Sequence, residues 1–270
     1  MPKNIIIVGA PRSGTSLTAR IFTQKGYFVT ADESNDLQEA NEFNPYGFWE
    51  SAGLRNCNAE LFESIGFPFL NTWLHERITE DQAMALLDQE PTEKHRNFVS
   101  IYNTHQPWMW KDPNLCYTVN YWWKLMDPEQ TGVLFLRRDP EDICHSFVRL
   151  RWCQNTRKDR ASTLERINHH MDFAEKTLKT YGIPHLFVNY RDYERDADAT
   201  AAKIADYFDI ELSGSDLGFE KKLNTSKANH LIWINAFSDL MPPGLMRFLK
   251  KLIPQYVFKK LFPSRYIDRS

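Results

Sequence analysis

The chain has 270 residues, 42% of them hydrophobic and 14% aromatic, and its formal net charge is −2. This length and composition suffice to bury the core of one large α/β domain or of two small ones. The nearly balanced charge argues against a nucleic-acid binder with a globally basic surface. We find no signal peptide and no apolar run of about 18 residues, so we expect a cytoplasmic protein without a membrane span.

The first predicted elements are a strand, a loop and a helix. Residues 5–8 are four β-branched residues in a row and predict a buried strand, and the turn that follows contains Gly9 and Gly14. A helix is expected from about residue 15 to residue 24. In such an arrangement, backbone N–H groups and the helix N-terminus all point at one anion. The sequence therefore predicts an anion-binding enzyme.

The loop differs from the ATP-binding pattern G-x-x-x-x-G-K-[ST] at one informative position. Gly9 and Gly14 have the right spacing, but Thr15 stands where the phosphate-binding lysine belongs, and the only cation in the loop is Arg12. A nucleoside triphosphate with its magnesium would lose its main charge partner. Thr15 therefore disfavours the alternative of a nucleotide or small-molecule kinase.

The loop sequence GAPRSGTS resembles the 5′-phosphosulfate loop of the sulfotransferases, in the PRSGT form found in protein-tyrosine and many bacterial carbohydrate sulfotransferases. The resemblance implies a P-loop nucleotide-binding α/β fold and 3′-phosphoadenosine-5′-phosphosulfate (PAPS) as co-substrate. A catalytically silent PAPS-binding module is a further alternative. The donor contacts that the resemblance implies in this loop are Pro11, Arg12, Ser13, Gly14, Thr15 and Ser16.

Two glutamates after the first helix are candidates for the catalytic base. Residues 27–44 are polar and acidic and are typical of a solvated surface loop. Glu33 in this loop lies 21 residues after Arg12, the separation between the arginine and the catalytic glutamate of the tyrosine sulfotransferases. Residues 44–51, NPYGFWES, resemble the NPxGxWE stretch of bacterial relatives, which makes Glu50 the second candidate. As an alternative, Glu50 is a first-turn carboxylate that complements a helix dipole.

A helical insertion is expected over about residues 52–105, between the first and second strands. Helices are predicted over residues 54–65, 79–87 and 92–102, the second opened by a capping box of Thr79 and Gln82. We interpret this insertion as a cap over the site.

Residues 108–115, WMWKDPNL, predict a short strand that delivers Lys111 at its end, then a turn and a helix over residues 117–125. Ligands of open α/β sheets lie at the carboxyl ends of strands, so Lys111 could reach the same cleft as Arg12. A surface lysine beside a turn is equally consistent with the pattern. The stretch resembles the family's KDP motif, whose lysine assists catalysis in the tyrosine enzymes. Asn114 replaces an arginine that many bacterial relatives carry.

The third motif begins at the end of a buried strand predicted over residues 132–138. A helix follows to about residue 150, and Arg138 and Ser146 form an Arg-x7-Ser pattern across it. The pattern resembles the motif that holds the ribose 3′-phosphate of PAPS, a task suited to the planar fork of arginine. Arg149 and Arg151 either add positive potential to the site or, in the interpretation that we favour, are solvated helix cations.

Weaker resemblances follow toward the C-terminus. Tyr190 begins YRDYERD, which resembles the YEDL stretch whose tyrosine lies near the nucleotide. Ser226, within NTSKAN at residues 224–229, lies in a plain loop or in the equivalent of a late loop that closes over PAPS. The remaining predicted elements are two helices and a strand, over residues 160–181, 197–208 and 185–190.

The tail over residues 244–270 is basic and amphipathic, with seven lysines and arginines against the single acid Asp268. It forms either helices that pack on the domain with a solvated cationic face or a contact with an anionic membrane or an acidic glycan. The predicted division is a sulfotransferase domain over residues 1–243 and this tail.

The resemblance as a whole implies a single α/β domain with a central, mainly parallel sheet flanked by helices. The expected reaction moves a sulfonate from PAPS to a hydroxyl of a glycan, glycolipid or small alcohol, although a peptide tyrosine also stays open. Arg12 and Lys111 would stabilise charge on the bridging oxygen. Should neither glutamate be the base, His105 or Asp112 would take its place. No metal is expected, and the four cysteines and eight histidines show no metal-ligand spacing.

Overall fold

The computed structural model describes residues 4–30, 36–37, 44, 47–67, 78–150, 152–218 and 241–254. Glu33, Arg151 and Ser226 lie outside these residues, as does most of the basic tail. The chain divides into two compact units, Met1–Asp139 with Arg166–Glu220 and Pro140–Glu165 with Lys221–Ser270. Each unit is described by itself, and the division at residue 243 stays a prediction.

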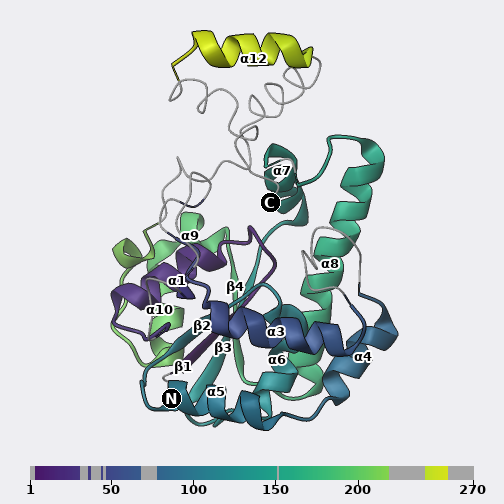
Figure 1. Ribbon diagram of the computed structural model, residues 1–270. Coiled ribbons are helices and arrows are strands. Elements are labelled where there is room, and N and C mark those ends of the chain that lie inside the picture. Colours follow the sequence, from purple (N-terminus) through teal and green to yellow (C-terminus); the bar gives the residue numbers. More distant parts are fainter. Residues whose placement is uncertain are drawn as a thin grey trace. The chain divides into compact units, whose positions relative to one another are not determined.

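The first unit is built on a four-stranded sheet in the order β2-β1-β3-β4 (Figure 1). All three strand pairs are parallel, which confirms the predicted α/β class with a parallel sheet. Its strands are β1 (Asn4–Val8), β2 (Met109–Lys111), β3 (Thr131–Arg137) and β4 (His185–Asn189). The order reverses between β1 and β3, and in open parallel sheets this switch point is where ligands bind.

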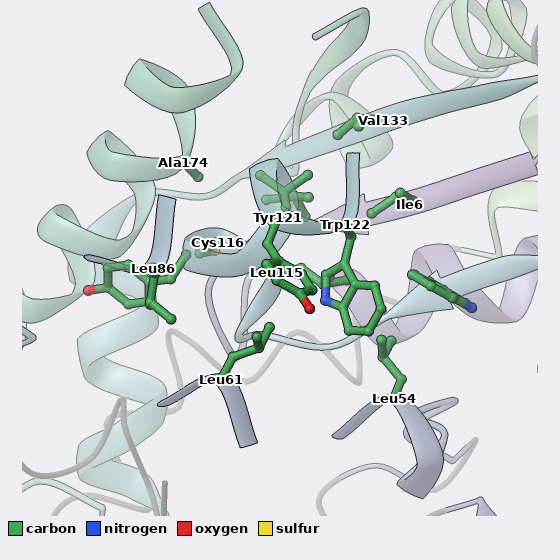
Figure 2. Packing of buried hydrophobic residues seen from close by; sticks show 14 of the residues in the cluster. Ile6, Leu54, Leu61, Leu86, Leu115, Cys116, Tyr121, Trp122, Val133 and Ala174 are labelled. Carbon is green, nitrogen blue, oxygen red and sulfur yellow. The ribbon is translucent and has the colours of Figure 1, made fainter. Parts of the chain in front are cut away.

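One face of the sheet is covered mainly by the helices inserted between β1 and β2. Ile6 and Val8 of β1 point to this face, because successive side chains of a strand alternate between its two sides. Figure 2 shows Leu54 and Leu61 packing with Trp122 in the same cluster. The helices of this layer are α3 (Ala52–Ser64), α4 (Glu80–Asp88), α5 (Glu93–Asn103), α6 (Leu115–Trp123) and the second half of α8 (Arg157–Thr180).

The described helices of residues 52–105, which were interpreted as a cap over the site, also form part of the domain core. Their apolar residues, among them Leu54, Leu86 and Val99, belong to the core cluster that includes Trp108 and Trp110 of the sheet region. The insertion is thus one layer of the domain core. Burying its large apolar surface is the main reason for its helices to order here, since burial contributes about 25 cal/mol per Å².

The opposite face is covered by a smaller set of elements. Ile5 and Ile7 pack there with Phe22 of α1 (Thr15–Gln24) and with Ile204 and Phe208 of α10. Figure 1 shows α1 and α10 on the side of the sheet opposite to α3 and α6. The other elements of this layer are α9 (Asp192–Arg195), α10 (Ala197–Phe208) and the short 3-10 helix η1 (Gly214–Leu217).

The predicted helices and strands agree with these bounds to within a few residues. The predicted capping box is present: Thr79 Oγ1 accepts from the N–H of Gln82 at 3.2 Å, and the Gln82 side chain accepts from the N–H of Thr79 at 3.1 Å. Helix α10 has the bounds predicted for residues 197–208.

The second unit contains α7 (Pro140–Arg149), the start of α8 and α12 (Pro243–Leu252). Arg160 links its first two helices, because its guanidinium donates to Glu141 at 3.0 Å and contacts His145 Nε2 at 2.9 Å. Arg149 is buried and donates to Ser146 Oγ at 3.2 Å. The interpretation of Arg149 as a solvated cation is therefore wrong, because this arginine packs inward and bonds its own helix.

Candidate functional site

A predicted site residue lies at or just after the carboxyl end of each of the four strands. Arg12 lies in the loop after β1, Lys111 ends β2, Arg138 follows β3 and Tyr190 follows β4. Since every pair of strands is parallel, these four ends lie at the same edge of the sheet. This edge is the candidate site.

The loop between β1 and α1 has an unusual backbone conformation. Arg12 has φ 66° although it is not glycine, and Gly14 has φ 102°. Left-handed conformations at residues with a side chain cost about 1–3 kcal/mol and cluster at functional sites. The buried Ser13 closes the turn, because its Oγ donates to the carbonyl of Ala10 at 2.6 Å and its N–H donates to the same oxygen at 3.1 Å.

Gly14 is required for a reason that its spacing in the motif did not reveal. A Cβ atom added there would lie 2.2 Å and 2.4 Å from two ring carbons of Tyr190. The ring thus occupies the place of a side chain at the end of the loop. Contact between residues 14 and 190 depends on the pairing of β1, β3 and β4, so a motif within residues 9–16 cannot predict it.

The N-terminus of α1 follows directly from the loop at this edge and has no side-chain cap. Its N-cap is Gly14, which offers no side-chain cap, and within α1, all of which the structure describes, the first turn contains no acidic residue. The first N–H groups of a helix have no partner inside the helix, and its dipole favours an anion there. The loop and the start of α1 therefore suit a phosphate or a sulfate group.

Lys111 is buried, and its ammonium group joins three segments of the chain. It donates to Ser16 Oγ of α1 at 3.1 Å, to the carbonyl of Phe48 at 3.1 Å and to the carboxylate of Glu50. The alternative of a surface lysine is therefore wrong. The ammonium group lies one hydrogen bond from the first turn of α1.

Glu50 reaches Lys111 through a turn with two left-handed residues, Gly47 at φ 86° and Trp49 at φ 57°. Helix α3 begins only at Ala52, with Ser51 as its N-cap. The alternative of Glu50 as a first-turn carboxylate is wrong for that reason. Its carboxylate forms an ion pair with Lys111 instead.

Asp36 stabilises this turn from the segment that was interpreted as a solvated loop. Its carboxylate accepts from Ser51 Oγ at 2.7 Å and from the N–H of Gly53 at 2.8 Å. That interpretation is wrong at Asp36, because its carboxylate is bonded to the start of α3. An acid among several in residues 27–44 gave no signal that would single it out.

Asp112 is a buried carboxylate directly after Lys111. It accepts from the N–H of Asn114 at 2.7 Å, from Asn114 Nδ2 at 2.8 Å and from Asn58 Nδ2 at 3.2 Å. Burial, reinforced by the nearby charge of Glu50, raises the pKa of Asp112 to about 6, although the Asn114 and Asn58 hydrogen bonds oppose the shift. Asn114 thus stabilises the turn after β2.

Asn58 was not predicted as part of the site. It is fully buried on α3, and its Oδ1 accepts from Thr118 Oγ1 at 2.9 Å and from Trp122 Nε1 at 2.8 Å. These bonds, with the one that its Nδ2 donates to Asp112, connect the turn after Lys111 to α6 and the core. The one signal in the sequence is an amide at the helical spacing of Leu54 and Leu61, which line the buried face.

Arg138 and Arg12 form a second cationic group at the edge. Arg138 donates to the carbonyl oxygen of Arg12 at 2.9 Å, and its Cζ lies 4.4 Å from the centre of the Tyr190 ring. Burial and the positive charge of Arg138 lower the pKa of Arg12 to about 10, while Tyr190 opposes the shift. A bound anion would relieve this repulsion between two guanidinium groups.

Of the other predicted site residues, the structure places only His105 relative to this edge. Ser146 is buried in the second unit, so its sharing of a phosphate with Arg138 stays a prediction. Glu33 and Ser226 lie outside the described residues. His105 is exposed and stacks on Phe28 with 4.3 Å between ring centres. Phe28 pairs with Trp108, before the start of β2, so His105 lies at the sheet edge opposite to Lys111.

The described residues contain no group of three or more histidine, cysteine, aspartate or glutamate side chains placed to hold a metal ion. The four cysteines are buried and free. No helix in the described part of the chain combines the length and the apolar character needed to cross a membrane.

Comparison with known proteins gives one family. A model described as "Sulfotransferase family" matches residues 2–214, whereas a search of curated proteins gives no match. Similar solved structures include a sulfotransferase domain of the Synechococcus PCC 7002 olefin synthase, with TM-score 0.43 and 16% identity over 90% of this chain and 82% of that one. A sulfotransferase domain of the curacin biosynthetic pathway has TM-score 0.43 and 12% identity over 80% and 77%. Sulfotransferase STF1 of Mycobacterium tuberculosis H37Rv has TM-score 0.40 and 14% identity over 83% and 76%.

Proposed function

The chain belongs to the sulfotransferase family, and on this premise we propose that it transfers a sulfonate group from PAPS to the hydroxyl group of an acceptor. Membership supports sulfonate transfer in general. The donor, the acceptor and the roles of individual residues are the parts that we propose here.

The observation that carries the proposal is the hydrogen bond between Lys111 Nζ and Ser16 Oγ at 3.1 Å. It joins the cation at the end of β2 to the N-terminus of α1, where backbone N–H groups favour an anion. A sulfonate bound by residues 11–16 of the loop and helix start would therefore lie within reach of a buried ammonium group.

In the proposed reaction, the acceptor oxygen attacks the sulfur atom while the bond from sulfur to the bridging oxygen of the 5′-phosphosulfate breaks. The electron pair of that bond stays on the bridging oxygen, which becomes part of 3′-phosphoadenosine 5′-phosphate (PAP). Arg12, Lys111 and the N–H groups of the loop stabilise the negative charge that develops there. The hydroxyl proton goes to a base, and the other product is a sulfate ester.

Arg138 is proposed to bind the 3′-phosphate of the donor, with Ser146 as its partner. Its guanidinium is held by the carbonyl of Arg12 and by the ring of Tyr190, which fixes the direction of its planar fork. Tyr190 would lie near the nucleotide, and Ser226 is proposed as a later donor contact.

We propose Glu33 as the base and Glu50 as the second candidate. The ion pair of Glu50 with Lys111 supports this ranking, because a base must be able to approach the acceptor hydroxyl. Asp112 is a weaker candidate, since three N–H groups already bond its carboxylate. The variants Glu33→Gln and Glu50→Gln separate these roles by kcat at saturating donor. If both keep near-normal turnover, neither glutamate is the base.

The proposed acceptors are glycans, glycolipids and small alcohols. A screen of such hydroxyl compounds with PAPS, followed by mass spectrometry of the sulfated product, would identify the class. A cytoplasmic location is also proposed, and the four free cysteines support a reducing compartment.

Thermal unfolding with added ligand tests the donor class. PAP at 100 times its dissociation constant is expected to stabilise the protein by about 2.7 kcal/mol. ATP with magnesium is expected to stabilise it far less. Stabilisation by ATP and magnesium alone would support a kinase and contradict the proposal. PAP binding without PAPS consumption across the acceptor screen would instead indicate a silent binding module.

A further inference from the structure

The charges of the chain are divided very unevenly. Residues 244–270 contain seven basic residues and one acidic residue, which gives this tail a net charge of +6. The remaining residues contain 26 of the 33 basic and 34 of the 35 acidic residues, a net charge of −8. A negative surface would approach the body of the chain unfavourably and the tail favourably.

The described part of this tail includes α12, drawn in yellow in Figure 1. Three of its large apolar side chains are exposed: Leu245 at 45%, Phe248 at 57% and Leu252 at 63%. Their spacing of three and four residues puts them on one face of the helix. Exposed apolar side chains that follow one face of a helix indicate a surface that another apolar phase covers.

The basic positions of the same helix complement this stripe. Arg247, Lys250 and Lys251 fall between the apolar positions, and 100° per residue places them around the opposite side of α12. Such a helix is typical of segments that lie in a membrane interface, with the apolar face among acyl chains and the cations near lipid phosphates.

We propose that α12 binds the surface of an anionic lipid bilayer through Leu245, Phe248 and Leu252. The charge complementarity of the tail selects an anionic partner, and the apolar stripe selects lipid over an acidic glycan, which offers no acyl phase. The family model ends at residue 214, so α12 lies outside the matched residues.

Co-sedimentation of the full chain with vesicles tests the inference. We expect binding to vesicles of phosphatidylcholine with phosphatidylglycerol, weak binding to phosphatidylcholine alone, and loss of binding as salt is raised. The triple variant Leu245→Ser, Phe248→Ser, Leu252→Ser is expected to weaken binding at least tenfold, with lysines intact. Absence of binding by the native chain, or equal binding by the triple variant, would overturn the inference.

A matched control removes exposed apolar side chains elsewhere. Met84 of α4 and Ile101 of α5 are each 51% exposed, so the pair Met84→Ser, Ile101→Ser loses exposed apolar surface outside the tail. The control is expected to bind vesicles as the native chain does, and an equal loss in both variants would count against a specific role of α12. A thermal midpoint of the triple variant within a few degrees of the native value would establish that its fold is intact.

Two other occupants of the stripe give different results. If α12 pairs with a second copy, light scattering detects a dimer that the triple variant dissociates while vesicles stay unbound. If the partner is an acidic glycan, heparin as a probe binds the native chain and the triple variant equally, and vesicles bind neither. Either result overturns membrane binding. The triple variant is expected to bind PAP as the native chain does. A failure of the membrane inference can therefore be distinguished from a failure of the proposed function.

Discussion

The candidate site holds positive charge in two places, which we call the Lys111 corner and the Arg12–Arg138 corner. The two corners hold this charge in different ways. Lys111 is compensated by the carboxylate of Glu50 and fixed by Ser16 and Phe48. Arg138 is oriented by a carbonyl oxygen and an aromatic ring, and its charge lowers the pKa of Arg12. In the Lys111 corner the ammonium group is paired with a carboxylate before any ligand arrives, whereas in the Arg12–Arg138 corner the charge of one guanidinium group lowers the pKa of the other.

The difference suggests that the two corners have different roles, one in binding and one in catalysis. An anion gains most where it relieves repulsion, so the Arg12–Arg138 corner is suited to binding phosphate. The ammonium group of Lys111 is held in one position by its ion pair and hydrogen bonds. The Lys111 corner is therefore suited to stabilising a charge that appears only during the reaction. Variants that disturb one corner at a time can test this division.

The largest effect is expected from Gly14→Ala, which disturbs the loop shared by both corners. Its Cβ would lie 2.2 Å from a ring carbon of Tyr190, at φ 102°. Strain and overpacking together predict a loss of about 4 kcal/mol of unfolding free energy, measured by urea denaturation. Gly26→Ala is the control, because Gly26 has φ 84° with no atom within 4 Å of the added Cβ. It should lose only about 1 kcal/mol; similar losses for both variants would remove the ring from the explanation.

A slightly smaller effect is expected from Asn58→Asp, which disturbs only the Lys111 corner. The new carboxylate would face that of Asp112, where Asn58 Nδ2 now donates at 3.2 Å. Two buried like charges predict a loss of about 3 kcal/mol of unfolding free energy at pH 7. Adding Asp112→Asn should restore most of it, because the amide would again face a carboxylate. Additive losses in this double-mutant cycle would show that residues 58 and 112 do not interact.

Arg138→Ala is expected to weaken PAP binding by about 2 kcal/mol, since hydrogen bonds to charged groups contribute about 1.5–3 kcal/mol. Its neighbour Arg137 provides the control, because Arg137 pairs with Asp172 at 2.7 Å and with Glu175 at 2.5 Å on α8. Arg137→Ala should leave PAP affinity unchanged in calorimetric titration. If both variants weaken binding alike, the anion site is not centred on Arg138.

The smallest expected effect is the pH dependence of stability that comes from Asp112, next to Lys111. The pKa of Asp112 is raised from 3.8 to about 6, so the native state binds its proton more tightly than the unfolded state, and stability falls as pH rises from about 4 to 6. Between pH 7 and pH 5 the native protein should gain about 1 kcal/mol relative to Asp112→Asn. Buried His170 has the opposite effect on the pH dependence of stability, because its pKa is lowered to about 4. Since the native protein and Asp112→Asn both contain His170, its effect cancels in the comparison. An unchanged difference between pH 7 and pH 5 would contradict the raised pKa.

The strands and most helices were predictable because local sequence decides them. Residues 5–8 are β-branched and buried, and Thr79 with Gln82 supplies a local cap. The strand ends also placed Arg12, Lys111 and Arg138 at one edge, because a parallel sheet leaves no other arrangement.

The remaining contacts depend on long-range packing. The pair Glu50–Lys111 joins residues 61 positions apart and requires a left-handed Trp49. The fit of Tyr190 against Gly14 and the bond from Asn58 to Asp112 likewise join segments distant in sequence. The burial of Arg149 was missed because a cation on a helix is usually solvated. No local sequence pattern predicts any of these contacts.

The most direct test is calorimetric titration of the native protein with PAP and with adenosine 5′-phosphate, which lacks the 3′-phosphate. A site that binds the 3′-phosphate through Arg138 predicts at least tenfold tighter binding of PAP. It also predicts that this preference disappears in Arg138→Ala and persists in Arg137→Ala. Equal affinity of the native protein for the two nucleotides, or the same preference in Arg138→Ala, would contradict the assignment of Arg138 to the 3′-phosphate of the donor.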